Sequence, residues 1–397
     1  MSPILQLPKR SKQQNIGEDI CDLSWILSKK KSNALEGKNS LSLIDLYCGC
    51  GGMSLGIEEA LKLNQFSLKI ALALDMDKDS LEVYKSNFEV SDEVALNIDI
   101  NQLVTTRIGE PLDKIEIIIK QKYKNIDILV AGPPCQGHSN LNNHTRRNDP
   151  RNNLYLNAIR FVEIVMPKVA IIENVSTVIH DIDDVVNQGK IGLEKKGYKI
   201  HSLIIDTSKY GLAQKRKRHF QIAIFNSDID IDLSSYLFNS QLKVADYIKD
   251  IITEHKFKSG IFYTPSKTKE INKKRIDYLF FKDLHDLPDS MRPDCHKTKS
   301  HSYKSCYGRM HWNKPAQTIT SGFGSMGQGR YVHSIEKRVI TPHEAARIQG
   351  FPDFFDFTKV TLRTSLHTMI ANAVPPKIIA VLASYLFKNK IFKDESK

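Results

Sequence analysis

Apolar residues follow two patterns along the chain, and the change between them divides the sequence. From residue 41 to about 226, apolar runs of strand length alternate with longer amphipathic stretches. The runs are LSLIDLY, SLKIALALD, IDILVAG, KVAIIEN and FQIAIF. This alternation predicts an α/β fold in which a mostly parallel sheet carries helices on both faces. Ligands bind beyond the carboxyl ends of the strands in such sheets, so the residues after each run are candidates for a site.

The rest of the chain lacks this alternation. Residues 1–40 are polar and Lys-rich, with apolar residues at helical spacing only over 16–27. Residues 241–310 contain 15 Lys and Arg against 9 Asp and Glu, and an apolar helical pattern returns from residue 361. A chain of 397 residues usually forms more than one domain. We expect an N-terminal arm, partly disordered or helical (1–40), a catalytic and cofactor-binding domain (41–226 with 361–390), and a smaller basic domain (227–360).

Composition narrows the class of protein. No apolar stretch approaches the length of a membrane span, and the first residues lack the apolar core of a secretion signal. The six cysteines are sparse and irregularly spaced, which fits a reducing compartment and predicts a cytoplasmic protein with free thiols. A formal charge of +12 suggests a polyanionic partner, although many basic proteins bind no nucleic acid.

The first apolar run ends in a glycine-rich turn, DLYCGCGGMSLGIEEA (45–60). Glycine allows the backbone to turn sharply and approach a ligand closely, although a tight turn without a ligand would look the same. A nicotinamide-type GxGxxG would need a glycine where the chain has Ser54. Asp75 and Asp99 follow later strands, where they can accept hydrogen bonds from a ribose and from an adenine amino group. Together these features describe a nucleoside pocket without phosphate binding, and S-adenosylmethionine is the common cofactor of that kind.

The segment AGPPCQGHS (131–139) carries a candidate nucleophile. Two consecutive prolines fix the backbone directly after the strand IDILV, so Cys135 is held at the ligand edge of the sheet. An isolated cysteine is usually a small buried hydrophobic residue, which is our interpretation of Cys21 and Cys48. The rigid turn favours the opposite interpretation for Cys135.

Two further segments end at the same edge. KVAIIENV places Glu173 and Asn174 there, and a carboxyl group in that position can hydrogen-bond the Watson–Crick face of a base. In QKRKR (214–218), strand alternation directs Gln214, Arg216 and Arg218 to one side, although such charge runs are often solvated. We predict no metal site, because the spacing of the candidate ligands is unlike that of zinc sites. Those candidates are Cys295, His296, His301, Cys306 and His311.

An ordered set of segments resembles the DNA (cytosine-5) methyltransferases of bacterial restriction–modification systems. The segments are DLYCGCGGMSLG, LDMD, DI, GPPCQG, DPRNNL, ENV, QKRKR, YGRMHWNKPAQTIT, ITPHEAARIQGFPD and NAVPP. They cover residues 41–226 and about 307–380, and their shared order is more specific than any single segment. The resemblance implies a Rossmann-like S-adenosylmethionine-dependent sheet and a DNA-recognition domain in the basic region, 227–360.

The resemblance also implies roles for individual residues. The catalytic set would be Cys135, Glu173, Asn174, Arg216 and Arg218. The cofactor would contact Tyr47, Gly49, Gly51, Asp75, Met76, Asp99, Ile100, Pro133, Asn372 and Val374. The substrate would contact Gln136, Ser139, Arg151, Gln214, Thr318 and Thr320. The chain departs from the usual pattern at Tyr47 and His138, where phenylalanine is common, and at Ala371, where glycine is usual.

The implied reaction transfers a methyl group from S-adenosylmethionine to carbon 5 of a cytosine that is rotated out of duplex DNA. We expect double-stranded DNA as partner, a monomer without membrane contact, association with the bacterial nucleoid through DNA, and a cognate restriction endonuclease acting independently. Two alternatives remain at this point: an RNA (tRNA) cytosine-5 methyltransferase and a catalytically inactive DNA-binding relative. A nicotinamide dehydrogenase is disfavoured by Ser54 and by the proline–proline–cysteine turn.

Overall fold

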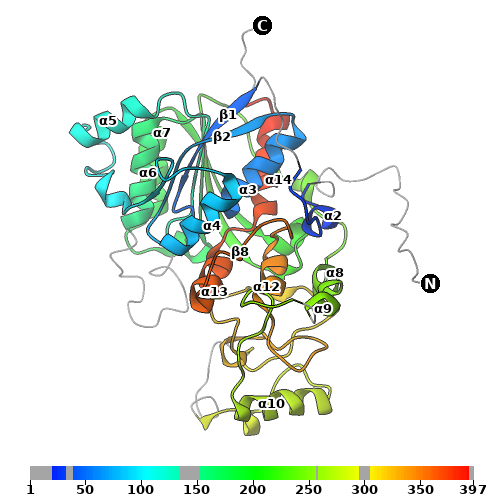
Figure 1. Ribbon diagram of the computed structural model, residues 1–397. Coiled ribbons are helices and arrows are strands. Elements are labelled where there is room, and N and C mark those ends of the chain that lie inside the picture. The colour runs from blue at the N-terminus through cyan, green and yellow to red at the C-terminus, as the bar shows by residue number, and fades with distance from the viewer. Residues whose placement is uncertain (1–19, 33–38, 135–152, 256–257, 295–304, 393–397) are drawn as a thin grey trace.

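A seven-stranded sheet forms the centre of the larger part of the molecule (Figure 1). The computed structural model describes residues 20–32, 39–134, 153–255, 258–294 and 305–392. The strands are β1 (Ser40–Leu46), β2 (Ser67–Asp75), β3 (Ala95–Asn97), β4 (Ile128–Ala131), β5 (Val169–Val175), β6 (Tyr198–Asp206) and β8 (Lys217–Phe225). Their order is β3-β2-β1-β4-β5-β8-β6. Strands β1 to β5 pair in parallel, whereas β8 is antiparallel to both β5 and β6.

The five apolar runs of the sequence form β1, β2, β4, β5 and β8, and the predicted mostly parallel α/β sheet is confirmed. The strand expected before Asp99 is β3, which ends two residues earlier at Asn97. Strand β6 was not predicted. It lies at the edge of the sheet and most of its residues are half-buried or exposed, so its sequence YKIHSLIID mixes polar with apolar residues and contains only a short apolar run.

Helices cover both faces of the sheet (Figure 1). Helices α3 (Gly52–Leu63) and α14 (Pro376–Lys388) share one apolar cluster with one face. Helices α5 (Lys114–Lys122), α6 (Asn153–Val165) and α7 (Val185–Glu194) cover the other face, and α4 (Lys78–Phe88) packs beside β2 and β3. The apolar pattern after residue 361 therefore belongs to the core of the sheet domain, as its spacing suggested.

One stretch, Arg363–Lys388, is long and apolar enough to cross a membrane by length and composition. However, 89% of its apolar window is buried inside the protein. It consists of α13 (Arg363–Asn372) and α14, separated by a short break before Pro376. These are core helices.

The smaller part of the molecule, at the bottom of Figure 1, has an apolar cluster of its own. It is built around α10 (Glu270–Phe281) and segments near residues 287, 306, 326, 332 and 339. Between the two parts lie α8 (Val244–Ile248), α9 (Ile251–Glu254) and α12 (Pro342–Gln349), whose apolar residues join the larger cluster. The short 3-10 helices are η1 (Ile100–Gln102), η3 (Ser176–His180), η4 (Thr207–Tyr210), η5 (Ser234–Tyr236), η7 (Asp289–Met291) and η8 (Met326–Gln328).

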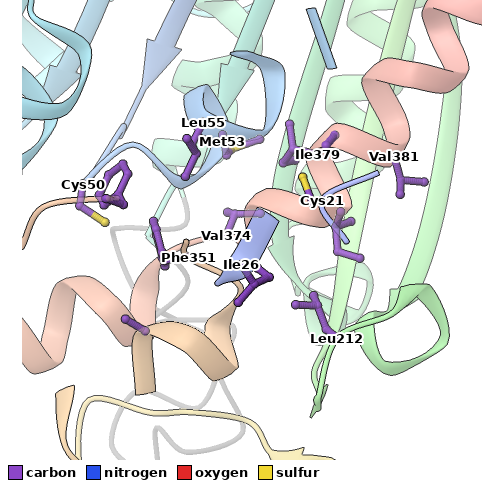
Figure 2. Close-up of a cluster of buried hydrophobic side chains, with 14 of the residues drawn as sticks. Cys21, Ile26, Cys50, Met53, Leu55, Leu212, Phe351, Val374, Ile379 and Val381 are labelled. Atoms are coloured by element: carbon purple, nitrogen blue, oxygen red, sulfur yellow. The ribbon is translucent and has the colours of Figure 1, made fainter. Parts of the chain in front are cut away.

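Residues 20–32 of the N-terminal arm pack against the larger part of the molecule. Helix α2 (Leu23–Ile26) contributes Ile26 to the main cluster, together with Cys21, near Ile379 and Phe351 (Figure 2). The ammonium of Lys377, buried in α14, donates to the carbonyl oxygen of Cys21 at 3.2 Å. This part of the arm is thus fixed by burial and by a hydrogen bond.

Candidate active site

Two turns meet at the carboxyl edge of the sheet, where the strand order reverses. Strand β1 has β2 on one side and β4 on the other, so the connections after β1 and β4 leave in opposite directions. Such a switch point forms a crevice that commonly holds a ligand. The glycine turn (47–51) follows β1, and the proline turn (132–134) follows β4.

The backbone of the glycine turn has an unusual conformation. Tyr47, Gly49 and Gly51 all have positive φ, at 56°, 50° and 97°. A side chain added at Gly49 would meet no atom within 4 Å, so open space lies beside the backbone there. At Gly51 a side chain would collide with the rings of Tyr84 and Phe88, so this glycine is required by packing.

Asp75, at the end of β2, holds the glycine turn in place. Its carboxylate accepts hydrogen bonds from the backbone N–H of Gly49 and of Asp77, both at 2.8 Å. Burial raises the pKa of Asp75 above its usual value, and the backbone donors partly oppose that shift. Beside it, the Met76 side chain is 68% exposed.

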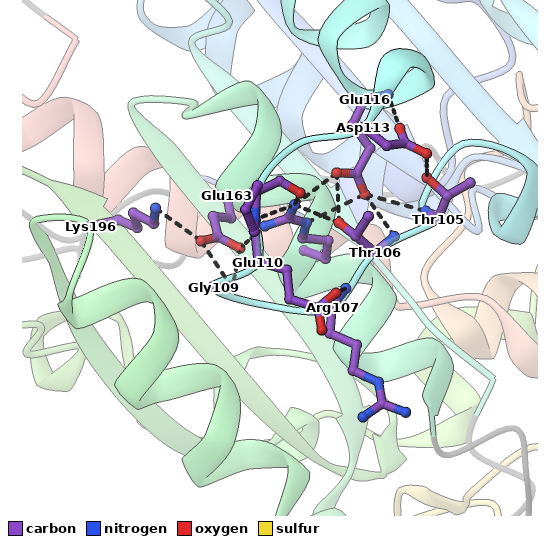
Figure 3. Close-up of polar contacts among 11 residues, drawn as sticks. Thr105, Thr106, Arg107, Gly109, Glu110, Asp113, Glu116, Glu163 and Lys196 are labelled. Carbon is purple, nitrogen blue, oxygen red and sulfur yellow. Dashed lines mark hydrogen bonds and ion pairs between the residues drawn. The ribbon is translucent and has the colours of Figure 1, made fainter.

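Asp99 and Ile100 lie in the next connection, after β3. The Asp99 side chain accepts from the backbone N–H of Asn101 and so caps η1, while Ile100 is buried beneath. The segment that follows is anchored by contacts of Thr106 with Glu116 (Figure 3), and Arg160 of α6 bonds both of these residues. The Arg160 guanidinium pairs with Glu116 at 2.7 Å and with Glu163 at 2.6 Å. The loop after Asp99 is therefore fixed to α6.

Ser54, which breaks the nicotinamide-type glycine pattern, has a defined structural role. Its hydroxyl donates to the Asp45 carboxylate at 2.5 Å and lies 2.7 Å from the hydroxyl of Tyr84. All three side chains are buried, and burial raises the pKa of Asp45 to about 7. The residue at position 54 thus ties β1, α3 and α4 together beneath the turn.

The far end of the chain completes the crevice. Val374 is buried, and a side chain added at Gly52 would lie 2.4 Å from the Val374 carbonyl oxygen. A side chain added at Gly132 would touch the Val374 side chain at 3.8 Å. Figure 2 shows Val374 beside Met53 and Phe351. Asn372, two residues earlier, is exposed.

The proline turn is linked to β5. Pro133 is buried and Pro134 is exposed. The side-chain amide of Asn174 donates to the Pro133 carbonyl oxygen at 3.4 Å, and its oxygen accepts from the N–H of Val175. The family resemblance places Asn174 in the catalytic set beside Glu173, and these contacts of its side chain hold the turn that leads toward position 135. Cys135, Gln136, Ser139 and Arg151 lie outside the described residues.

Glu173 is a buried carboxyl group next to an arginine. The Nε of Arg218 lies 2.9 Å from the Glu173 carboxylate, across the antiparallel pair of β5 and β8. Burial raises the pKa of Glu173, and the charges of Arg218 and Arg216 only partly oppose this shift. A carboxyl group with a raised pKa can serve as a proton donor, and the adjacent guanidinium can stabilise negative charge.

Two predicted segments that are distant in sequence pair directly. Strand β7 (Gln214–Lys215) runs parallel to β9 (Ala316–Gln317), which brings QKRKR beside PAQTIT. Arg216 is buried, and its guanidinium donates to the Ala371 carbonyl oxygen at 3.0 Å. Thr318 donates to the Lys215 carbonyl oxygen, and Thr320 bonds the hydroxyl of Tyr331.

Gln214 differs from its expected place. It is 0% exposed, and its amide bonds the side chain of Gln349 and the backbone N–H of Ile319. In this arrangement it has no surface with which to contact a substrate, and it joins β7 to α12 instead. Alternation predicted that Gln214, Arg216 and Arg218 lie on one side of the strand. In the structure these three are buried or half-buried and the two lysines between them are exposed, but alternation could not tell a substrate-facing side from an interior one.

Sequence analysis missed several residues that shape the site. Tyr331 bonds Thr318 and Thr320, and Tyr84 closes the network beneath the glycine turn. Little in the sequence indicates the roles of these two tyrosines, because buried tyrosines are common and the partners of these two lie far away in sequence. Of the residues weighed as metal ligands, Cys295, His296 and His301 lie outside the described residues.

Comparisons with known proteins agree with this geometry. The model of the family described as C-5 cytosine-specific DNA methylase matches residues 41–388. The chain is 42% identical over 369 residues to the type II methyltransferase M1.BsuMI of Bacillus subtilis (strain 168), covering 92% of this chain and 84% of the relative. It is 28% identical over 351 residues to the type II methylase M.HgiDII of Herpetosiphon aurantiacus, covering 86% of this chain and 94% of the relative.

Solved structures share the fold. A protein described as a DNA modification methyltransferase encoded within a prophage of E. coli matches with a TM-score of 0.57 and 22% identity, over 88% of this chain and 99% of that one. The Dnmt2 methyltransferase of S. pombe matches with a TM-score of 0.57 and 19% identity, over 89% and 100%. At these identities the likeness concerns the fold, whereas the family model and the curated relatives define the family. The chain belongs to the C-5 cytosine-specific DNA methylases.

Proposed function

We propose that this DNA (cytosine-5) methyltransferase acts through Cys135, Glu173 and Arg218 on a single cytosine rotated out of a specific duplex sequence. The observation that carries the proposal is the pairing of Glu173 with Arg218 at 2.9 Å, at the sheet edge where Asn174 holds the proline turn before Cys135. Burial at this edge of the sheet also raises the pKa of Glu173, which suits a carboxyl group that donates a proton to a base.

The family and the fold imply S-adenosylmethionine as methyl donor. The residues of the crevice fit such a molecule, because open space lies beside Gly49, an acid follows β2 and another follows β3, and the Met76 side chain is exposed. We assign the methionine portion to Tyr47, Gly49, Gly51, Pro133, Asn372 and Val374. We assign the ribose to Asp75, and the adenine to Met76, Asp99 and Ile100. When bound, the cofactor supplies an electrophilic methyl group.

The protein's own residues must activate the cytosine, because its carbon 5 is a poor nucleophile. Covalent addition of the Cys135 thiolate to carbon 6 makes carbon 5 enamine-like. This addition moves negative charge toward N3 and O2 of the ring, so a proton donor is needed at N3 and a cation near O2. Protonated Glu173 provides the first, and Arg218 or Arg216 the second. Once carbon 5 carries the methyl group, loss of its proton, return of the N3 proton to Glu173 and expulsion of the Cys135 thiolate would restore the ring.

Recognition of DNA is assigned to the basic region. We propose that residues 227–360 form the target-recognition domain and that residues 41–226 with 361–390 form the catalytic domain. Lys and Arg in the basic region would contact phosphates and position groove-reading side chains. Substrate contacts are further proposed for Gln136, Ser139, Arg151, Thr318 and Thr320, while Gln214 supports the neighbouring strand from the interior.

Several features of the biological setting are also proposals. The enzyme would work as a monomer, because one rotated base requires one active site. A cognate restriction endonuclease would act independently on the same sequence, since the relatives named above are type II methyltransferases. Association with the bacterial nucleoid would follow from the charge of +12 and the affinity for DNA.

Bisulfite sequencing of total DNA from bacteria that express the chain tests the proposal. Cytosines within one short duplex sequence are expected to resist conversion in cells with the wild-type chain, and to convert fully in cells with Cys135→Ala. Methylation of tRNA without any protected DNA sequence would contradict the assignment of duplex DNA. Protected DNA in the Cys135→Ala cells would contradict the assigned nucleophile.

A further inference from the structure

Helix α6 contacts the glycine turn through the side chain of Tyr47. The phenolic hydroxyl of Tyr47 donates to the carbonyl oxygen of Leu154, in the first turn of α6, at 2.8 Å. This side-chain hydrogen bond joins the segment proposed to hold the cofactor to the first turn of α6. The bond thus connects the turn to an element that contains none of the proposed cofactor contacts.

Tyr47 has a backbone conformation that needs support from its surroundings. Its φ of 56° is in the left-handed region, which a residue with a bulky side chain seldom adopts. Such conformations persist when neighbouring structure over-determines them, and they concentrate at functional sites. The ring of Tyr47 packs against the apolar cluster of α6 and α7, and its hydroxyl adds the directional contact with Leu154.

Helix α6 reaches the opposite end of the proposed cofactor site as well. The Asn157 side-chain amide donates to the Asn101 side-chain oxygen at 2.7 Å. Asn101 lies in η1, which Asp99 caps. Leu154 and Asn157 are about one helical turn apart, so one face of α6 is bonded to both the methionine end and the adenine end of the site.

Helix α6 is itself held firmly, so its hydrogen bonds to Tyr47 and Asn101 fix the positions of both ends of the proposed cofactor site. Arg160 in the middle of α6 forms the buried ion pairs with Glu116 and Glu163 and also donates to Thr106 at 2.6 Å (Figure 3). The hydroxyl of Tyr155 donates to the Gln221 side chain of β8 at 2.8 Å. Because α6 has this many buried partners, the hydrogen bond from Tyr47 restrains the glycine turn and does not move the helix.

We propose that the hydroxyl of Tyr47 is a positioning group for the cofactor: by bonding α6, it holds residues 47–49 in the conformation that accepts the methionine portion of S-adenosylmethionine. The inference rests on the proposed function of the glycine turn. The hydroxyl acts by fixing the backbone of the turn, so its removal is expected to change cofactor affinity while leaving the chemistry of Cys135 and Glu173 unchanged.

Tyr47→Phe tests the proposal, because it removes one oxygen atom and keeps the ring. Steady-state kinetics on a duplex with the recognised sequence should show KM for S-adenosylmethionine raised about three- to ten-fold, the effect of one neutral hydrogen bond. The turnover number should stay within about two-fold of wild type. Tyr155→Phe is the matched control: it removes a hydroxyl from a bonded tyrosine of the same region, but that tyrosine bonds β8 and does not touch the glycine turn.

The control separates positioning from stability. Both variants should lower the midpoint of thermal unfolding by similar amounts, whereas only Tyr47→Phe should weaken binding of S-adenosylhomocysteine in calorimetry. Equal cofactor affinity in Tyr47→Phe and wild type would overturn the proposal. Equal weakening in both variants would also overturn it, because a general loss of stability would then account for the change.

Asp75→Asn distinguishes failure of this inference from failure of the proposed site. If Asp75→Asn weakens cofactor binding while Tyr47→Phe does not, the site is correct and the positioning role is wrong. If neither variant changes the affinity, the placement of the cofactor in this crevice is wrong. The Asp75→Asn protein must remain folded by circular dichroism, because Asp75 also accepts from the backbone of the turn.

Discussion

Among single residues, Glu173 shows most clearly how the surroundings set the chemistry. Its burial disfavours the charged form, while two nearby arginines favour it, and the first effect is larger. The result is a carboxyl group that keeps its proton to a higher pH than an exposed glutamate. In the proposed mechanism, this proton lets Glu173 donate to N3 of the base while the Cys135 thiolate is attached to carbon 6.

Glu173→Gln is expected to lower the single-turnover methylation rate at least about 100-fold, since a glutamine can bond N3 but cannot give up a proton. The methylation rate of the wild-type enzyme should fall as the pH rises. Glu173 is active when protonated, so deprotonation reduces the wild-type rate as pH rises through its raised pKa. The variant should lack that decline on the alkaline side.

Glu194→Gln, a change of the same kind in the exposed part of α7, serves as the control and should behave as wild type. Affinity for duplex DNA is measured by fluorescence anisotropy on the same samples and should change little in Glu173→Gln. A variant at 173 with the wild-type rate and pH profile would contradict the role of this carboxyl group.

The residues that follow the strands could be predicted well, because few kinds of side chain are suited to the carboxyl edge of the sheet, where ligands bind. Asp75, Asp99 and Glu173 all lie there, as their sequence context indicated. Whether a side chain faces the ligand or the interior could not be predicted, and Gln214 is the example: its partners Gln349 and Ile319 are over 100 residues away. Ser54 was recognised only as a missing glycine, because its partner Tyr84 is on another helix.

Among the elements, strands buried on both faces were predicted, whereas the edge strand β6 was not. Strands β4 and β5 contain continuous apolar runs, since helices cover both of their faces. Strand β6 has covered and exposed sides, and β7 and β9 have two residues each, so none of them has a distinct sequence pattern. The 227–360 region contains short helices without the alternation of the sheet domain, as its sequence suggested.

The packing of α14 on α3 makes a sharp prediction about glycine. A side chain added at Gly56 would lie 2.3 Å from the Pro376 carbonyl oxygen and 2.7 Å from the Ile379 side chain. Because the backbone of α14 would have to move, Gly56→Ala should reduce the free energy of unfolding by about 1–3 kcal/mol. Urea denaturation followed by circular dichroism measures this change.

Gly192→Ala in α7 is the matched control. Its added methyl would lie 2.6 Å from the γ2-methyl group of the half-buried Ile108, so a side chain has to shift but no backbone atom does, and alanine is the better helix former. This variant should lose clearly less stability than Gly56→Ala. A Gly56→Ala protein as stable as the Gly192→Ala protein would show that α3 and α14 do not approach as closely as described.

In the whole molecule, the site depends on parts of the chain that are far apart in sequence. The glycine turn near residue 50, the proline turn near 133, Glu173 and the segment around Val374 converge at one edge of the sheet. This convergence could be predicted only from the resemblance, because the chain's segments occur in the same order as in the family. No local sequence pattern links residue 52 to residue 374. The basic charge, in contrast, is a property of the whole chain and could be read directly.

Covalent trapping tests the central claim most directly, since the claim is that the sulfur of Cys135 bonds the target cytosine. The substrate is a duplex that contains the sequence recognised by the enzyme, with 5-fluorocytosine in place of the target cytosine. It is incubated with the enzyme and S-adenosylmethionine and then analysed on a denaturing gel. Fluorine at carbon 5 cannot leave as a proton does, so the wild-type chain should remain attached to the DNA. Cys135→Ala should leave no attached species. A wild-type chain that methylates the ordinary duplex but forms no adduct, or an adduct that persists in Cys135→Ala, would contradict the account.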